Sequence, residues 1–428
     1  MRNANELIAV TRDALNHMVS SPSGGGDLWL AHSDADDLYV VTVVESISGA
    51  RLPAERRGYG ALARADGRID GQWLRDVPLG AHILHRELAL RPDTAYPLRT
   101  FMALVPDARD PRSGRYPLIT HTADVPPEAR TAGVPTVAGW NVTSGGVWPL
   151  DVAVEPEVAG VSRLALQWPV EQLRGARVVI VGLGSIGGIV AQSLAASGVG
   201  NLELVDPDRF LWHNLVRHIL GPDDVGRMKV SALKERIENR WPTTSVVAHP
   251  LDVVRDAHLI RPLFAHADLI VCAADGIAPR RTVSHLARQT GRTAVLTCVL
   301  DDGAVGEVLR LRPGSRFGCL MCQRRALEAA GALDAEADQE LDYGTGLVHK
   351  PMTAVGPDLW LVAELAAKAS ISTLLEALGY AEHQLPGEQA VLALRTGNDL
   401  ASPFNVSHTG KVAWYPATGP LPGCWTCE

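Results

Sequence analysis

The chain has 428 residues, of which 46% are hydrophobic and 21% charged. These values describe a globular protein with two domains and exclude a largely disordered chain. The net charge of -8 gives no reason to expect nucleic acid as a partner. No segment approaches about 18 consecutive apolar residues, and the first residues lack the apolar stretch of a signal peptide. We therefore expect a cytoplasmic protein with no membrane partner.

The first part of the chain, residues 1–158, is predicted to be a separate α+β domain. We expect a helix from Asn5 to Val19, followed by strands at Leu28–Ala31 and Leu38–Val44. Short apolar runs and many prolines follow, which indicates long loops. Trp140 and Trp148 in this part are expected in the core or at an interface.

Residues 159–428 show a different pattern, in which apolar strands alternate with amphipathic helices. Strands are predicted at 177–182, 202–205, 245–249, 268–273 and 293–299. Helices are predicted at 186–197, 229–240, 283–290 and 357–378. This alternation is typical of an α/β fold with a Rossmann-like, doubly wound and mostly parallel sheet.

A glycine-rich segment follows the first of these strands and leads into a helix. Gly182, Gly184 and Gly187 have the spacing G-x-G-x-x-G. The first glycine makes a tight turn, the second lets the backbone approach a phosphate, and the third lets the helix pack closely on the strand. Asp206 ends the next strand, where an acid can bind ribose hydroxyls. The pattern predicts a nucleotide site, and alone it does not separate ATP from NAD.

The charged residues farther along the chain favour ATP. Asn214, Arg217 and Lys229 follow the second strand, and Asp275 follows the fourth. A triphosphate that loses pyrophosphate needs fixed cations and a carboxylate that holds Mg²⁺. Taken singly, Arg217 and Lys229 also fit solvated helix charges, and Asp275 also fits a helix cap. Their joint spacing from the glycine loop favours a phosphate site.

The cysteines fall into two groups. Cys272 and Cys298 lie in apolar strands, where a cysteine usually behaves as a small hydrophobic residue. The other four form two Cys-x-x-Cys pairs: Cys319 with Cys322, and Cys424 with Cys427. Four thiolates suit a structural Zn²⁺ that joins the last residues to the second domain. The alternative, a redox role for the pairs, lacks a thioredoxin-like context.

With these motifs, residues 177–325 resemble the adenylation domain of the E1-like superfamily, which includes molybdopterin-synthase and thiamine adenylyltransferases and ubiquitin-activating enzymes. The matching segments are VGLGSIGG, LELVDPD, HNLVRH, GRMK, ADG and GEVLRLRPGSRFGCLMC. The resemblance implies that Asp206 binds ribose and that Asn214, Arg217 and Lys229 surround the phosphates of ATP. It also implies that Asp275 binds Mg²⁺ near the α-phosphate.

The resemblance implies further features. An arginine is supplied by the partner of a homodimer, and Arg163 is the candidate. A crossover loop at about 326–356 covers the carboxylate substrate, with His349 and Lys350 as candidate contacts. Ubiquitin-activating enzymes carry a reactive cysteine after the first zinc pair, whereas residues 323–423 contain none. We therefore expect no enzyme thioester in that loop.

The role of the first domain is less defined by its sequence. Its opening helix and two strands resemble a JAB-type isopeptidase domain. His82, His85 and His121 do not reproduce the His-x-His metal pair that such a domain needs, so we expect no protease activity. A substrate-recognition or dimerisation module is favoured.

The function predicted from the sequence is ATP-dependent adenylation of the C-terminal carboxylate of a ubiquitin-like protein or peptide. Two alternatives remain at this point. One is a nicotinamide-dependent oxidoreductase, and the other is a catalytically inactive E1-like scaffold subunit.

Overall fold

The computed structural model describes residues 6–54, 67–91, 94–112, 114–156, 160–301, 303–331, 354–395 and 401–428. The chain divides into two units, Met1–Ala159 and Gly160–Glu428, and each is described by itself. Across the described ranges, every helix is too short or too polar to span a bilayer.

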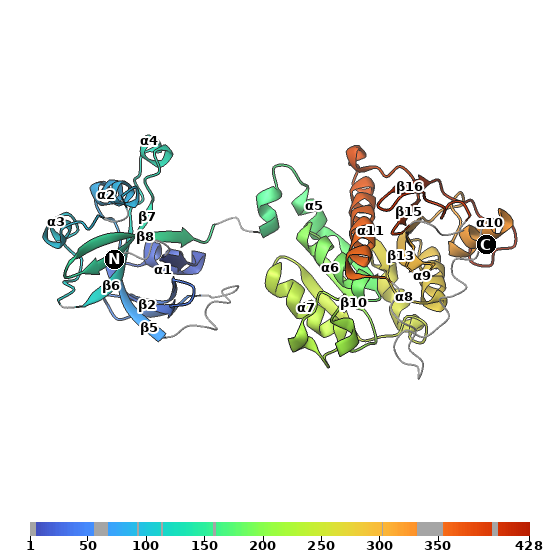
Figure 1. The fold of residues 1–428 in the computed structure, drawn as a ribbon, viewed down its shortest axis with the longest axis horizontal. Helices are drawn as coiled ribbons and strands as arrows, with labels where there is room; N and C mark the ends of the chain where they lie inside the picture. The colour runs from blue at the N-terminus through green and yellow to red at the C-terminus, as the bar shows by residue number, and fades with distance from the viewer. Residues whose placement is uncertain are drawn as a thin grey trace. The chain divides into compact units, whose positions relative to one another are not determined.

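The described residues of the N-terminal unit form one strongly curved sheet and helices α1 to α4 (Figure 1). Its strands are β1 (Leu7–Val10), β2 (Gly25–Ser33), β3 (Leu38–Ser46), β4 (Arg51–Pro53), β5 (Gly67–Leu74), β6 (Arg115–His121), β7 (Val137–Thr143) and β8 (Gly146–Val154). Its helices are α1 (Arg12–Ser20), α2 (Leu79–Ala89), α3 (Leu98–Leu104) and α4 (Pro127–Thr131).

The sheet of the N-terminal unit closes on itself. Its order is β1-β8-β7-β6-β5-β2-β3-β4, and β1 also pairs with β3. Every strand except β4 therefore belongs to a closed ring, which leaves a barrel with few unpaired edges. Helix α1 packs on β3, whereas α2 packs on β7 and β8. Trp140 of β7 is fully buried in the core beside α2 and α3.

The predicted helix from Asn5 is wrong over Leu7–Val10, which form β1. These four residues pair in parallel with both β8 and β3, and Ile8 and Val10 are fully buried. The helix begins only at Arg12, after Thr11 accepts a hydrogen bond from the Ala14 amide at 3.0 Å. Long-range pairing has overridden the local helical pattern. The predicted strands at Leu28–Ala31 and Leu38–Val44 lie within β2 and β3.

The C-terminal unit is an α/β fold with a doubly wound sheet. Its strands are β9 (Arg177–Val181), β10 (Asn201–Val205), β11 (Ser245–His249), β12 (Leu269–Cys272), β13 (Ala294–Leu300), β14 (Val305–Leu311), β15 (Gln389–Ala393) and β16 (Val412–Tyr415). Its helices are α5 (Val170–Gly175), α6 (Ser185–Ala196), α7 (Lys229–Arg240), α8 (Ala257–Ala265), α9 (Ile277–Gln289), α10 (Leu320–Ala329) and α11 (Gly356–Ala377), with short 3₁₀ turns η2 (Gly160–Leu164), η3 (Trp212–Asn214), η4 (Pro222–Asp224) and η6 (Ala381–His383).

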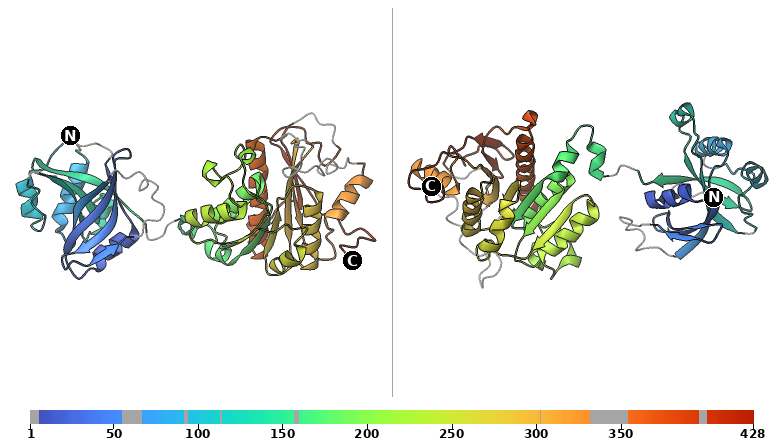
Figure 2. Two further views of the ribbon diagram at one scale, coloured as in Figure 1. Left: turned by 90° about the horizontal axis from the view of Figure 1, so that it is seen from below. Right: turned by 180° about the vertical axis from the view of Figure 1, so that it is seen from behind.

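The sheet order is β11-β10-β9-β12-β13-β14-β15-β16. Strands β9 to β13 are parallel, and β14, β15 and β16 extend the sheet in antiparallel fashion. Helices α6, α7 and α11 cover one face and α8 and α9 cover the other (Figures 1 and 2). The Rossmann-like, mostly parallel sheet predicted from the sequence is confirmed. The antiparallel strands and helices α8 and α10 were not predicted.

The register of the parallel strands places three loops at the same edge. Val181 at the end of β9 lies opposite both Val205 at the end of β10 and Cys272 at the end of β12. The chain passes from β9 to β10 in one direction and later to β12 in the other, so β9 is a topological switch point, where such sheets bind ligands. The loops after these three strands carry Gly182, Asp206 and Asp275.

Candidate functional site

The glycine loop connects β9 to α6 at the switch point. Gly182 has φ of +82°, and a Cβ there would lie 2.4 Å from the Ala274 amide nitrogen. A Cβ on Gly187 would lie 1.8 Å from the Gly182 carbonyl oxygen. Only glycine fits either position. By contrast, a Cβ on Gly184 would meet no atom within 4 Å. The backbone is therefore open at Gly184, beside the N-terminus of α6, where free amides attract phosphate.

Asp206 holds the glycine loop through a hydrogen bond. Its carboxylate is buried and accepts hydrogen bonds from the Leu183 amide at 2.6 Å and the Asp208 amide at 2.8 Å. Burial raises the pKa of Asp206, while the Lys229 ammonium, 3.8 Å away, acts to lower it. The predicted contact with ribose remains a prediction, because the structure shows Asp206 holding the glycine loop.

Asp208 was not predicted as a site residue. Its carboxylate accepts a hydrogen bond from Lys229 Nζ at 2.8 Å, and 52% of its side chain is exposed. Lys229 itself begins α7 and is buried. The pair of acids in LELVDPD was a possible signal, since Asp208 follows Asp206 by two residues and is the more accessible of the two.

Asn214 and Arg217 lie in and just after η3. The Asn214 side-chain oxygen accepts a hydrogen bond from the Leu211 amide at 2.8 Å, so it stabilises the turn. The Arg217 side chain is half-buried, and within the described part of the chain its Nε atom has no hydrogen-bond partner. Such an orphan donor suits a ligand that supplies the missing acceptor.

Asp275 lies in the loop between β12 and α9. The residue as a whole is exposed, but many protein atoms surround its carboxyl group. This crowding raises the pKa of Asp275, whereas the charges of Arg217 and Lys229 act most strongly to lower it. The structure thus brings Arg217, Lys229 and Asp275 to one edge of the sheet, beside the glycine loop.

Arg163 is not brought to this edge. It lies in η2 with an exposed side chain and, among the described residues, forms no hydrogen bond with the glycine loop or with Asp275. The predicted crossover loop is also not tested, because residues 332–353, including His349 and Lys350, lie outside the described residues.

His218 is a second residue that sequence reasoning missed. It is buried, and its Nδ1 atom accepts a hydrogen bond from the Leu220 amide at 3.1 Å. Nε2 therefore carries the proton and donates to the Leu183 carbonyl at 2.7 Å. Burial lowers the pKa of His218 to about 4, so the ring is neutral at pH 7. The ring holds the glycine loop in place from the side of η3.

The four paired cysteines form one cluster. Their sulfur atoms all lie within 4.8 Å of one another, with Cys319 3.5 Å from Cys424 and Cys322 3.7 Å from Cys427. A tetrahedral ion with Zn–S bonds of about 2.3 Å requires S–S separations of roughly 3.8 Å. The observed distances fit such an ion and are too long for disulfides. Among the described residues it is the one group of this kind.

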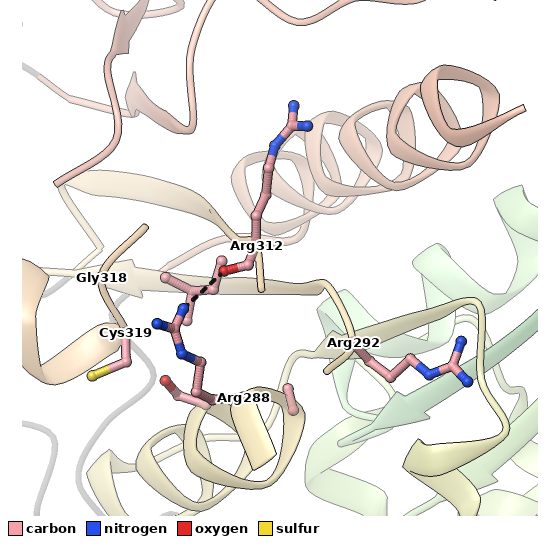
Figure 3. Close-up of a pocket in the computed structure, with 8 residues that line it drawn as sticks. Arg288, Arg292, Arg312, Gly318 and Cys319 are labelled. Carbon is pink, nitrogen blue, oxygen red and sulfur yellow. Dashed lines mark hydrogen bonds between the residues drawn. The ribbon is translucent and has the colours of Figure 1, made fainter. Parts of the chain in front are cut away.

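The first cysteine pair is held by the neighbouring helix α9. Arg288 donates a hydrogen bond to the Arg312 carbonyl at 3.3 Å (Figure 3). Arg288 also donates to the Phe317 carbonyl at 2.8 Å, and Ser284 accepts a hydrogen bond from the Leu320 amide at 3.0 Å. The cavity between these groups measures about 10 Å³, room for about one water molecule. The cavity is therefore too small for a ligand, and the residues around it have a structural role.

A buried ionic network lies between α9, α10 and the central strands. The Glu307 carboxylate is fully buried and accepts hydrogen bonds from Arg324 Nη1 at 2.8 Å, Gln389 Nε2 at 2.7 Å and Arg280 Nη2 at 3.2 Å. Burial alone would raise the pKa of Glu307, yet Arg324 and then Arg280 outweigh it and hold the pKa at about 2. The network fixes α10, which carries Cys322 and Gln323, to the sheet.

The two isolated cysteines and two of the histidines considered in the sequence are buried in the protein. Cys272 is fully buried and Cys298 nearly so, and burial raises the pKa of Cys272 to about 11, which leaves it an unreactive thiol at neutral pH. In the N-terminal unit, His82 and His85 are buried in α2 and contact backbone carbonyls. Neither they nor His121 belong to a metal-binding group among the described residues.

Comparison with curated proteins gives several adenylyltransferases. The chain is 34% identical over 139 residues to the sulfur carrier protein adenylyltransferase of Thermus thermophilus and 35% identical over 115 residues to the molybdopterin-synthase adenylyltransferase of Escherichia coli. It is 34% identical over 166 residues to the sulfur carrier protein ThiS adenylyltransferase of Bacillus subtilis. These matches cover 32%, 27% and 38% of this chain and 50%, 45% and 48% of the relatives. The chain thus spans half the length of these relatives or less.

Among solved structures, E. coli MccB with ATP is 22% identical, with a TM-score of 0.45, over 60% of this chain and 68% of the other. The model of the family described as the ThiF family matches residues 160–409, which is more than half of the chain and includes the glycine loop and Asp275. The chain belongs to the ThiF family.

Proposed function

We propose that this protein binds Mg·ATP and uses it to adenylate the C-terminal carboxylate of a ubiquitin-like protein or peptide. The observation that carries the proposal is the gathering of Arg217, Lys229 and Asp275 at the strand edge that also holds the glycine loop. A dinucleotide needs little beyond the helix N-terminus for its pyrophosphate, so two cations and a carboxylate there favour a triphosphate. The adenylyltransferase names of the relatives support the same activity.

The reaction forms one bond and breaks one. A carboxylate oxygen of the substrate forms a bond to the α-phosphorus of ATP, and the bond from that phosphorus to the bridging oxygen of pyrophosphate breaks. The products are an acyl adenylate and pyrophosphate. Because the carboxylate is already a nucleophile, the protein needs no general base and acts by positioning and charge neutralisation.

Each site residue has a defined task in this proposal. The open backbone at Gly184 and the N-terminus of α6 receive phosphate oxygens. The Nε–H group of Arg217, which has no partner among the described residues, donates a hydrogen bond to a phosphate oxygen. Lys229 adds a second positive charge. Asp275 would hold Mg²⁺, which supplies further neutralisation of the phosphates when bound. The crowding that raises the pKa of Asp275 also strengthens its attraction to a cation that replaces the proton.

The acyl group is proposed to leave the enzyme without a thioester in the crossover loop. Residues 323–423 contain no cysteine, and Cys272 and Cys298 are buried. The acyl adenylate would therefore pass to an amine or sulfur acceptor that comes from elsewhere.

The four-cysteine cluster is proposed to hold a structural Zn²⁺. All four ligand positions are filled by sulfur, which leaves no open position for a reactive water. The ion would fix the segment that carries Cys424 and Cys427 to α10 and thereby to the sheet.

A homodimer is proposed, in which Arg163 of one copy completes the site of the other. Arg163 is exposed and its neighbours Leu164 and Leu166 are 48% and 99% exposed, which suits a segment that contacts a second copy. If Arg163 acts between copies, a mixture of Arg163→Gln and Asp275→Asn proteins regains part of the activity that each lacks. No recovery on mixing would place Arg163 outside the partner's site.

The proposal is tested by calorimetric titration of the full chain with Mg·ATP and, separately, with NADH. We expect saturable binding of ATP alone, weakened at least about ten-fold by Arg217→Gln and by Asp275→Asn. Asp223→Asn, which changes an exposed acid in η4, is the matched control and leaves binding unchanged. Binding of NADH without ATP would instead support an oxidoreductase.

A second measurement separates an enzyme from an inactive scaffold. Pyrophosphate exchange into ATP is followed with a synthetic peptide that ends in Gly-Gly and with the same peptide as its C-terminal amide. Exchange with the acid and none with the amide supports adenylation of a carboxylate. ATP binding without exchange for this peptide or for purified ubiquitin-like proteins would support the scaffold.

A further inference from the structure

The barrel of the N-terminal unit contains a cavity of about 220 Å³. Five strands contribute residues to its wall, and three of the lining side chains are polar. The lining residues are Tyr39 of β3, Ile69 of β5, Arg115 and Pro117 of β6, Asn141 of β7 and Leu150 of β8. We call this space the barrel cavity.

Two of the polar groups in the barrel cavity are available to a ligand. Within the described ranges, Arg115 forms no salt bridge, and the side-chain amide of Asn141 makes no hydrogen bond. Arg115 is the first residue of β6 and is exposed. A guanidinium presents two parallel N–H groups to a carboxylate, and the Asn141 amide can donate beside it.

Tyr39 provides a third donor. Its ring is buried, and its hydroxyl lies 3.5 Å from Glu6 Oε1, the long limit of a hydrogen bond. Burial raises the pKa of Tyr39, and Glu6 raises it further, while Arg115 acts to lower it. The phenol is therefore protonated at pH 7, and Tyr39 and Arg115 line the same cavity. The weakly held hydroxyl can turn toward an acceptor in the cavity.

The other three residues that line the barrel cavity are apolar. Leu150 and Pro117 are buried, and Ile69 is half-buried. The volume is below the 300–1,000 Å³ that is usual for drug-sized ligands, so the occupant is small. We propose that the barrel cavity binds a carboxylate on a small apolar group, either a free acid or the C-terminal residue of a peptide.

This site lies in a different unit from the nucleotide site and does not depend on the proposed adenylation. The test is calorimetric titration of the full chain, without ATP, with N-acetyl-leucine and with N-acetyl-leucinamide. The two probes have nearly the same shape and differ in the carboxylate. We expect saturable binding of the acid alone, weakened about ten-fold or more by Arg115→Gln, because a charge-assisted bidentate contact is lost.

Controls separate this site from a general charge effect. Arg99→Gln removes an exposed arginine of the same unit that does not line the cavity, and it leaves binding unchanged. Tyr39→Phe weakens binding several-fold. Asp275→Asn leaves it intact, so a failure of the adenylation proposal is visible separately. Free leucine and a short peptide ending in leucine then show which source of the carboxylate binds.

The titrations either support or overturn the carboxylate site. Binding of the acid that is lost in Arg115→Gln and kept in Arg99→Gln supports the barrel cavity as a carboxylate site. Equal binding of the acid and the amide, unchanged binding in Arg115→Gln, or no binding of either probe would overturn it.

Discussion

The indole Nε1 of Trp360 donates a hydrogen bond to the backbone carbonyl of Arg217 at 3.1 Å. Trp360 lies in the first turns of α11, and Arg217 follows η3. The bond fixes the backbone from which the Arg217 guanidinium projects. Helix α11 therefore positions Arg217, which is proposed to bind phosphate and lies 143 positions earlier in the chain.

Replacing Trp360 by Phe removes this bond while it keeps an aromatic ring. One hydrogen bond contributes about 1 kcal/mol, so we expect the KM for ATP in pyrophosphate exchange to rise about five-fold, with a smaller change in kcat. Trp212→Phe is the control, because that indole is 72% exposed and is not tied to Arg217. Equal effects of both substitutions would argue against a positioning role for Trp360.

Alanine substitutions at two glycines separate folding from phosphate binding. Gly187→Ala places a methyl group against the Gly182 carbonyl, so we expect a lower melting temperature and no ATP binding. Gly184→Ala has open space around the new methyl group, so the melting temperature should stay near that of the parent while ATP binding weakens. Thermal unfolding and ATP titration of both variants check this pair, and tight ATP binding by Gly184→Ala would contradict it.

Metal analysis tests the cysteine cluster. We expect one zinc ion per chain in the purified protein and none after Cys424→Ser and Cys427→Ser are combined. Chelation of the ion should lower the melting temperature of the unsubstituted protein, because the bound ion stabilises only the folded chain. Cys298→Ala, outside the cluster, should keep its zinc. A full zinc content in the double variant would place the ion elsewhere.

Glu307→Gln tests the buried ionic network. Removing one partner of a buried pair leaves uncompensated charge, which typically destabilises by about 3–5 kcal/mol. We expect a large drop in the urea midpoint at pH 7. Glu235→Gln, which breaks a pair with Arg227 in which the Glu235 side chain is 59% exposed, should change it little.

The same network predicts a pH dependence. The pKa of Glu307 falls from an ordinary value of 4.5 to about 2 in the folded protein. A depressed pKa stabilises the fold above pH 4.5, and this contribution is lost as the pH falls from 4.5 toward 2. The stability gap between the unsubstituted protein and Glu307→Gln should therefore narrow across that window. A gap that stays constant between pH 5 and pH 3 would contradict the assignment.

The sequence predicted the parts of the C-terminal unit that depend on local patterns. The apolar strands β9 to β13 and helix α7 carry their periodicity within a few residues, and the glycine loop has a fixed spacing. The strand β14 was missed although all seven of its residues are buried. A short run that is buried on both sides carries no period that distinguishes a strand from a helix.

His218 and Trp360 were missed for a different cause. His218 donates to a carbonyl 35 positions away and Trp360 to one 143 positions away. Both partners are backbone atoms, which carry no side-chain signature in the sequence. The N-terminal strand β1 was mistaken for helix for a related reason, since its partners in β3 and β8 lie far along the chain.

The distance between the two cysteine pairs has a consequence for a nicked chain. Cys319 and Cys424 are 105 positions apart, so a single peptide bond cleaved between them leaves one cysteine pair on each fragment. If the cluster holds the proposed Zn²⁺, both fragments would remain ligands of that ion. Proteolysis in this stretch would therefore appear on a denaturing gel as two bands, while the native particle would elute at its original size.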